Sequence, residues 1–183
     1  TTLKNSGAEA LMIAGTPKFA AQAIRQAFVI GWKAKIILDF PSGSVGGTLV
    51  PAGLDKSVGV IVGTINKDVG DPTWKDDPGM QAYRAFVEKY LPGVDITNGS
   101  YLTGYQQGIL LEQILKQCGS DLSRKNILAQ AKNLRDFVIP TVLPGIKANT
   151  SEANNMIWTQ MRLQRWTGST WEGFSAVLDA GSE

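Results

Sequence analysis

The chain has 183 residues, of which 43% are hydrophobic and 19% are charged, a composition typical of folded globular proteins rather than disordered ones. Its net charge of +2 comes without any run of four lysines or arginines, so the electrostatic footprint of a nucleic-acid-binding protein is missing. The lack of histidine and the presence of a single cysteine exclude histidine-based catalytic triads, the commonest metal ligand and an internal disulfide.

The first third of the sequence predicts buried strands that alternate with a helix. Apolar runs at residues 8–14, 35–40 and 58–65 are typical of strands in a parallel sheet. Between the first two, apolar residues recur at helical spacing from Pro17 until Gly31, which predicts a helix with proline at its first position. This order of elements is that of a βαβ unit.

The middle of the chain is first polar and then helical. Residues 67–77 are rich in aspartate, glycine and proline, which favours a connection between two parts of a fold. Helices are predicted at residues 78–91, 100–117 and 124–134, the first of them capped by Asp77. The buried stripe of that first helix is predicted to consist of Tyr83, Phe86, Val87, Tyr90 and Leu91.

The tail changes to a two-residue period that predicts a β-hairpin, with strands at residues 157–164 and 171–177 around a turn at Gly168. The fold class is therefore α/β, but the fold is incomplete. A doubly wound α/β fold has about five or more strands, and helices cover both faces of its sheet. Two or three parallel strands followed by helices cannot form such a fold. The sequence has the pattern of the latter part of a larger fold.

Two features concern the setting of the protein. No apolar stretch is long enough to span a bilayer. No secretory signal precedes Thr1, which fits a mature or shortened chain, or a cytosolic protein. Cys118 stands at a helix end before a glycine, where a small buried side chain is expected; a disulfide to another segment and a reactive thiol remain alternatives.

A series of short strings, taken together and in order, resembles the type I periplasmic binding proteins, in particular the branched-chain amino-acid transport group. The resemblance spans essentially the whole chain, and it rests on the joint order of strings that are individually unspecific. The strings are Ala8 to Pro17, Gly31-Trp32, Pro51-Ala52-Gly53, Asp68 with Asp71-Pro72-Thr73-Trp74, Gly104-Tyr105, Cys118 to Arg124, Leu143 to Ile146 and the closing hairpin.

The resemblance implies a type I periplasmic-binding-protein fold with two Rossmann-like lobes, of which this chain is the C-terminal half. The N-terminal half of the same protein then becomes a partner. The implied division is 1–66 for the latter part of the second lobe, 67–77 for an inter-lobe crossing, 78–150 for helices of the first lobe, and 151–183 for a hairpin that returns to the second lobe.

The resemblance also implies a function. Such a protein is a substrate-binding component of an ABC transporter: in the periplasm, or on the outside of a Gram-positive cell, it captures a small solute between its lobes and delivers it to a membrane permease. The implied ligand is a small carboxylate, either a branched-chain or other aliphatic amino acid or an aromatic carboxylate. No cofactor, no nucleic acid and no enzymatic activity are expected.

The first candidate ligand-binding residues are Gly15, Thr16 and Pro17. They lie where a strand ends and a helix begins, which is the usual ligand edge of an open α/β sheet. The free N–H groups and the positive end of the helix dipole favour a carboxylate there. The alternative is that Thr16 only caps its own helix.

The second candidates are Ser42 and Ser44, in a loop of small residues at 41–47 that follows the second strand at the same edge. The family's amino-acid binders place an acidic residue near this point to pair with the ligand's ammonium. Residues 40–44 contain no Asp or Glu, which favours a ligand without that group, since an ammonium buried without a counter-charge is unfavourable. The resemblance implies an aromatic side chain that faces the cleft at the start of the second helix of the middle part, and Tyr101 is the candidate for it.

Two other functions remain open from the sequence. An α/β enzyme would need its catalytic residues in a segment outside this chain, since no nucleophile–base pair or cofactor fingerprint is present. A ligand-sensing module of the same fold is the other alternative. The pair Asp76-Asp77 lacks the spacing of a metal-binding loop and fits the start of a helix.

Overall fold

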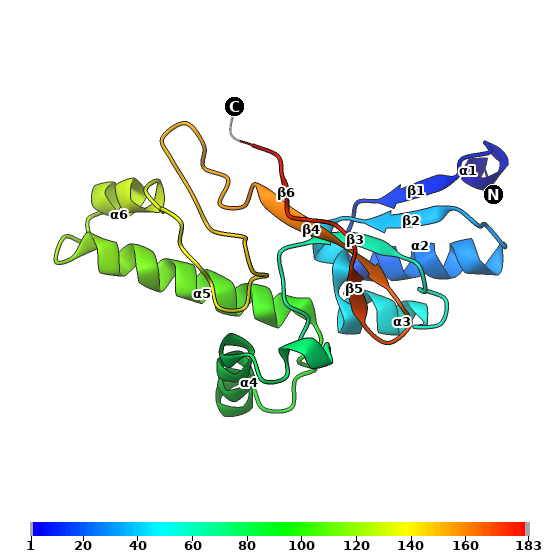
Figure 1. Ribbon diagram of the computed structural model, residues 1–183, viewed down its shortest axis with the longest axis horizontal. Coiled ribbons are helices and arrows are strands. Elements are labelled where there is room, and N and C mark those ends of the chain that lie inside the picture. The colour runs from blue at the N-terminus through cyan, green and yellow to red at the C-terminus, as the bar shows by residue number, and fades with distance from the viewer. Residues whose placement is uncertain (1, 182–183) are drawn as a thin grey trace.

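A mixed β-sheet organises one end of the molecule, as the computed structural model of residues 2–181 shows (Figure 1). Residue 1 and residues 182–183, the outer ends of the first and last predicted segments, lie outside the described residues. The strands are β1 (Ala10–Ile13), β2 (Lys35–Leu38), β3 (Ile61–Thr64), β4 (Gln160–Trp166), β5 (Trp171–Gly173) and β6 (Leu178–Asp179).

The strand order is β1-β2-β3-β4-β5, with β6 also paired to β4. The first three strands are parallel, and β4 runs antiparallel to β3, β5 and β6. The predicted parallel strands and the closing hairpin are thus confirmed, although each strand is shorter than its apolar run. The tail strand β4 returns over a long sequence distance to extend the sheet beside β3.

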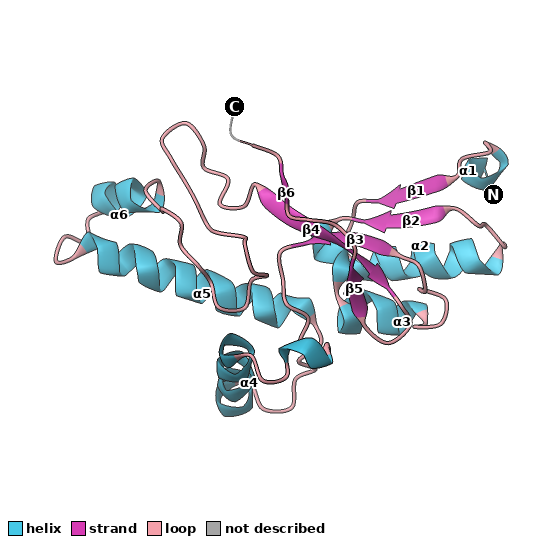
Figure 2. Ribbon diagram, viewed as in Figure 1, coloured by secondary structure: helices cyan, strands magenta, loops and turns pink. Residues whose placement is uncertain are grey.

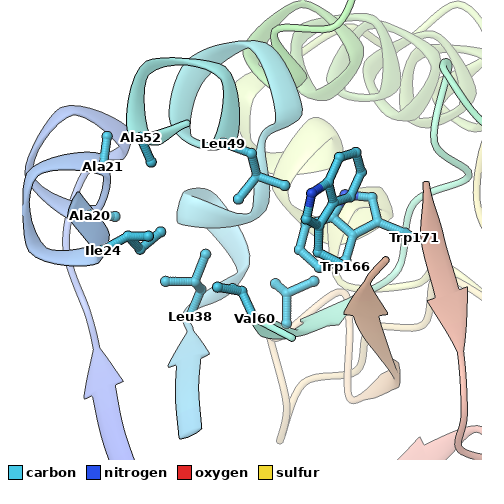
Figure 3. Close-up of a cluster of buried hydrophobic side chains, with 10 residues drawn as sticks. Ala20, Ala21, Ile24, Leu38, Leu49, Ala52, Val60, Trp166 and Trp171 are labelled. Atoms are coloured by element: carbon cyan, nitrogen blue, oxygen red, sulfur yellow. The ribbon is translucent and has the colours of Figure 1, made fainter. Parts of the chain in front are cut away.

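One face of this sheet is covered by helices. The covering elements are α2 (Pro17–Val29) and the short helix α3 (Val50–Ala52), both on the same side of β1–β3 in Figure 1. Beyond them, α1 (Thr2–Asn5) is a single turn at the sheet's far end. Figure 3 shows the resulting core, which runs from Ile24 on α2 past Leu38 and Leu49 to the pair Trp166 and Trp171 at its other end. The ring centroids of the two tryptophans are 5.4 Å apart, in an edge-on arrangement.

The segment predicted as a loop at 41–47 is helical instead. It forms the 3-10 turn η1 (Phe40–Gly43) and the π-helical turn η2 (Val45–Leu49). The physical reason is capping: the Asp39 carboxylate accepts a hydrogen bond from Ser42 N, and the Ser44 hydroxyl accepts one from Gly47 N. Because this stretch is rich in glycine, its residue types predict a loop and not a helical turn.

The helical part of the molecule stands apart from the sheet (Figure 2). After the short turn η3 (Pro72–Trp74) come α4 (Pro78–Tyr90), the long α5 (Gly99–Cys118) and α6 (Arg124–Ala131). The side chains of Asp77, Asn98 and Ser123 accept hydrogen bonds from the first turns of these helices. All three predicted helices are present, and the third ends earlier than predicted.

A second core lies against α5, where the irregular chain from Leu134 to Ala148 packs its apolar residues. A third joins α4 to α5 through Met80, Tyr83, Val87 and Leu102.

The predicted stripe of α4 is only partly buried. Tyr83 is fully buried, but Phe86 and Tyr90 are 37% and 59% exposed. Phe86 nevertheless contacts α5, since its ring centroid lies 5.0 Å from that of Tyr105.

The opposite face of the sheet is bare. Register pairs Met12 with Ile37 and Ile37 with Ile61, so these side chains share the face that α2 does not cover. Met12 is 70% exposed, and Phe174 at the other end of the same face is 44% exposed, with the guanidinium of Arg165 4.8 Å from its ring centroid. Strands in parallel sheets are normally buried on both faces. This apolar face departs from that rule, since no described element covers it.

Candidate ligand-binding cleft

A cleft with a volume of about 360 Å³ lies between the sheet and the start of α5. Its near wall is the η1–η2 region, and its floor is formed by side chains of β3, β4 and β5, namely Val62, Thr64, Gln164 and Trp171. Its far wall is the stretch from Ile96 to Thr103. The chain therefore brings residues more than a hundred positions apart into one hollow at the carboxyl ends of parallel strands, where open α/β sheets bind ligands.

A small hydrogen-bonded network fixes the edge of the sheet. The two carboxylate oxygens of Asp39 accept hydrogen bonds from Gly15 N at 3.0 Å and Ser42 N at 3.2 Å. The Ser42 hydroxyl is fully buried and donates to Gly15 O at 3.1 Å. Gly15 and Ser42 thus hold β1 and β2 together at their carboxyl ends, and neither lines the cleft.

Ser44 does line the cleft, and it joins the two parts of the molecule. Its hydroxyl oxygen accepts hydrogen bonds from Gly47 N and from Gly99 N, each at 3.0 Å. A backbone bond from Gly46 N to Thr97 O at 3.1 Å lies beside it. A Cβ on Gly46 would stand 2.5 Å from the hydroxyl of Thr97, so only glycine allows this close approach.

Thr16 and Pro17 begin α2 at the mouth of the cleft, and of these two only Pro17 lines it. Thr16 has the extended backbone of an N-cap, but its side chain makes no cap hydrogen bond and is exposed. The alternative in which Thr16 only caps its helix through its side chain is therefore not what the structure shows. Its hydroxyl makes no hydrogen bond to the start of its own helix.

Tyr101 lies elsewhere. It lines a second hollow, between α4 and α5, with Phe86, Leu91 and Tyr105. Tyr105 in turn packs against Tyr83 and Phe86, with ring centroids 5.3 and 5.0 Å away. The structure separates Tyr101 from the cleft that Ser44 and Pro17 line.

Two ionisable side chains among the described residues line the cleft, Lys67 and Asp68, and sequence reasoning did not select either as a site residue. Lys67 is 7% exposed; its Nζ donates to Asp77 Oδ2 and to Pro140 O, both at 2.7 Å, and lies 5.2 Å from the ring centroid of Trp74. Burial alone would raise the pKa of Asp77, but the hydrogen bonds from Lys67 and from Met80 N, with the charge of Lys67, outweigh it and lower that pKa.

The pKa of Asp68 is shifted upward, opposite to that of Asp77. Burial raises the pKa of its carboxyl, and the nearby Asp71 carboxylate adds to that effect, against the hydrogen bond that Asp68 Oδ1 accepts from Gly70 N at 2.8 Å. One signal could have identified both residues: they follow directly after the third predicted strand, at the edge where ligands bind.

The described residues contain no group of three His, Cys, Asp or Glu side chains placed to hold a metal ion. Cys118, as expected, is a buried free thiol. None of the described helices is long and apolar enough to cross a membrane.

A sequence model of a family described as periplasmic binding protein matches residues 1–170. The chain belongs to this family. The resemblance found in the sequence and the predicted fold class are therefore confirmed, and the members of this periplasmic binding protein family bind substrates for transport and are typically not enzymes. No curated protein sequence matches the chain at a significant level.

Solved structures share the fold of this periplasmic binding protein chain at low identity. A branched-chain amino-acid ABC transporter protein from Thermus thermophilus with bound valine superposes with a TM-score of 0.74 at 12% identity, covering 97% of this chain and 48% of its own. A possible leucine/isoleucine/valine-binding protein from Rhodopirellula baltica gives 0.73 at 17%, covering 91% and 42%. A fatty acid ABC transporter substrate-binding protein from Thermomonospora curvata gives 0.69 at 17%, covering 97% and 45%. The chain spans less than half the length of each.

Proposed function

We propose that this chain forms one wall of a cleft that captures a small carboxylate solute and delivers it to the membrane permease of an ABC importer. The observation that carries the proposal is the cleft of about 360 Å³ at the carboxyl ends of β1–β3, in a chain whose family binds solutes. The solutes named for the similar structures, valine, leucine and fatty acids, are all carboxylates. The proposed solute is an aliphatic amino acid or an aromatic carboxylate.

The carboxylate is proposed to bind at the start of α2. The exposed hydroxyl of Thr16 makes no bond to its own helix, and the dipole of α2 favours an anion at this end. Pro17 and Ser44 supply neighbouring wall, while Gly15 and Ser42 keep the edge of the sheet in place through their mutual bond. Tyr101 lines the second hollow and is not part of the proposed carboxylate site.

Closure of the cleft is proposed to take place about residues 67–77, between the sheet and the helical part. The proposed division assigns 1–66 and 151–183 to one lobe and 78–150 to the other. Contacts from Ser44 and Gly46 to the start of α5 support a closed arrangement, since they join the two sides directly. Solute would be gripped as these sides come together.

A second half of the protein is proposed to complete the cleft. The similar structures are more than twice as long as the part that this chain matches. The bare apolar face that contains Met12 and Ile37 needs a cover, and an N-terminal half of the same protein would supply it. The proposed location is the periplasm, or the outside of a Gram-positive cell, as the family implies.

Thermal-shift measurements on the complete protein would test the proposal. A solute at about 100 times its Kd stabilises the protein by about 2.7 kcal/mol, which raises Tm by about 3 °C for a protein about twice as long as this chain. Aliphatic amino acids and aromatic carboxylates are expected to give such shifts, and sugars are not. Responses to sugars alone would refute carboxylate capture.

Thr16→Val provides a matched variant for the same assay. Because the Thr16 side chain is exposed and makes no cap bond, the unliganded Tm should stay unchanged. The shift produced by a carboxylate should shrink, since the hydroxyl that the anion uses is gone. An unchanged shift would remove Thr16 from the site.

A further inference from the structure

One buried polar side chain on the floor of the cleft lacks a partner within the protein. The buried polar side chains among the described cleft residues are Ser44, Thr64, Lys67 and Gln164, each at most 9% exposed. Ser44, Thr64 and Lys67 each form a side-chain hydrogen bond within the protein. Gln164 is 7% exposed, and its carboxamide makes no hydrogen bond to a described residue. Gln164 is therefore the exception that needs a physical reason.

The place of Gln164 in the sheet explains why its neighbours leave the carboxamide unbonded. On β4 it lies opposite Val62 of β3 and Gly173 of β5. Val62 is apolar and Gly173 has no side chain, so neither can bond the carboxamide through a side chain. Two positions further along β4, Trp166 points to the same face and belongs to the core of the sheet. Gln164 thus stands where an apolar side chain would suit the packing better.

The chemistry of a carboxamide defines the group that would satisfy it. Its nitrogen donates two hydrogen bonds and its oxygen accepts two, and burial without partners is unfavourable. A carboxylate could satisfy only the donors and an ammonium only the acceptor, whereas a neutral group such as a second carboxamide both donates and accepts. The cleft around Gln164 is otherwise apolar at Val62, Leu102 and Trp171. This lining matches an apolar solute body that ends in a neutral polar group.

We infer that Gln164 binds a neutral group that both donates and accepts hydrogen bonds, at the end of the solute opposite its carboxylate. The cleft then selects solutes with such an end over hydrocarbons of the same shape. The inference rests on the proposed function for the presence of a solute in this cleft, and it narrows the class of that solute. The carboxylate lies at the mouth of the cleft beside Pro17, and the neutral group lies on the floor, which β4 helps to form.

Three probes of nearly the same shape test this inference on the complete protein: 4-carbamoylbutanoate, 5-methylhexanoate and 5-methylhexanamide. They carry a carboxylate with a carboxamide, the carboxylate alone and the carboxamide alone. Binding is measured by calorimetry to wild type, Gln164→Met and Gln81→Met. Methionine keeps the length of glutamine and removes the carboxamide. Gln81 is exposed on α4 and does not line the cleft, so its variant makes the same chemical change away from the site.

Wild type is expected to bind 4-carbamoylbutanoate more tightly than 5-methylhexanoate, because the hydrocarbon end leaves Gln164 unpaired. In Gln164→Met the affinity for 4-carbamoylbutanoate should fall about 10-fold, the effect of leaving a buried polar group without its partner, while 5-methylhexanoate binds at least as tightly as before. Gln81→Met should bind all three probes like wild type. Without ligand, the urea midpoint of Gln164→Met should stay the same or rise, since no bond within the protein is lost.

The contrary outcomes separate the two proposals. If 5-methylhexanoate binds as tightly as 4-carbamoylbutanoate and Gln164→Met leaves both affinities unchanged, Gln164 bonds only water; the inference is overturned while carboxylate capture stands. A urea midpoint that falls in Gln164→Met, with the preference for the carboxamide intact, gives Gln164 a structural role and also overturns the inference. If only 5-methylhexanamide binds and Gln164→Met weakens that binding, Gln164 is supported and carboxylate capture fails. If no probe binds, both proposals are refuted for solutes of this shape.

Discussion

Replacing Lys67 by methionine tests whether the connection between the sheet and the helical part is locked by one buried cation. The Nζ of Lys67 bonds Asp77, the N-cap of α4, and the carbonyl of Pro140, both at 2.7 Å, and its side chain is 9% exposed. Methionine keeps the length and the apolar stem of the side chain. The substitution therefore removes the charge and both hydrogen bonds while leaving little empty space.

The expected loss of stability follows from the burial of the pair. Removing one partner of a fully buried ion pair costs about 3–5 kcal/mol. The Asp77 side chain is 20% exposed and keeps its bond from Met80 N, so a loss of about 2–4 kcal/mol is expected for Lys67→Met. With a urea m-value of about 2 kcal/mol/M, the midpoint of unfolding falls by about 1–2 M.

Lys116→Met is the control. Lys116 also forms an ion pair, with Glu112 at 2.6 Å, but the two side chains are 67% and 63% exposed. An exposed pair of this kind contributes at most about 0.5 kcal/mol, so the urea midpoint should hardly move. Equal midpoints for the two methionine variants would show that Lys67 does not lock the connection.

The same variant should change the response to acid. Because the folded-state pKa of Asp77 is lowered, its contribution to stability is present above the unfolded value near 3.8 and is lost as pH falls through the lower folded value. In Lys67→Met the hydrogen bond and charge that lower this pKa are absent, so less stability is lost below pH 4. An acid-unfolding profile identical in slope to wild type would contradict this account of Asp77.

Three further predictions concern packing and charge. Trp166→Ala should lose about 3–5 kcal/mol by urea unfolding followed by circular dichroism, because the side chain is 2% exposed in the sheet core. Gly79→Ala should lose about 1–3 kcal/mol, since its Cβ would lie 2.5 Å from a facing backbone carbonyl, while Gly108→Ala in α5 has open space and should gain about 0.5–1 kcal/mol. Asp68→Asn should raise the urea midpoint at pH 7 without ligand, because a carboxyl with a raised folded pKa destabilises the fold once ionised, and Asp76→Asn should not.

Much of the fold could be predicted because its signals are local. Apolar runs marked β1–β3, and Asp77 and Ser123 marked helix starts by the capping chemistry that the structure shows. The turns η1 and η2 were missed because their caps act within a glycine-rich stretch. There the sequence favours a loop, and only the bonds of Asp39 and Ser44 make the helical turns stable.

The site was less predictable because side-chain direction depends on tertiary packing. Tyr101 directly precedes Leu102, and successive residues of a helix point about 100° apart. Burial of Leu102 and Leu110 fixes the rotation of α5 and turns Tyr101 toward α4. The ion pair between Lys67 and Asp77 likewise forms only because the folded chain turns back on itself. From the sequence alone, the adjacent Lys67 and Asp68 do not reveal which of them has an ion-pair partner.

The apolar sheet face and the Asp68 carboxylate both lack a partner among the described residues, and they require partners of different kinds. The apolar sheet face around Met12 exposes hydrocarbon, whose burial stabilises by about 25 cal/mol per Å², without directionality and in proportion to area; such a surface needs a large cover that stays in place. The Asp68 carboxylate is a single directional acceptor in a small cleft; burial raises its pKa, and it has no ion-pair partner within 4 Å among the described residues. A small donor can satisfy it and leave again, because one charge-assisted hydrogen bond is worth only a few kcal/mol. A permanent partner on the sheet face and an exchangeable one in the cleft are what the proposed capture and release of a solute would require.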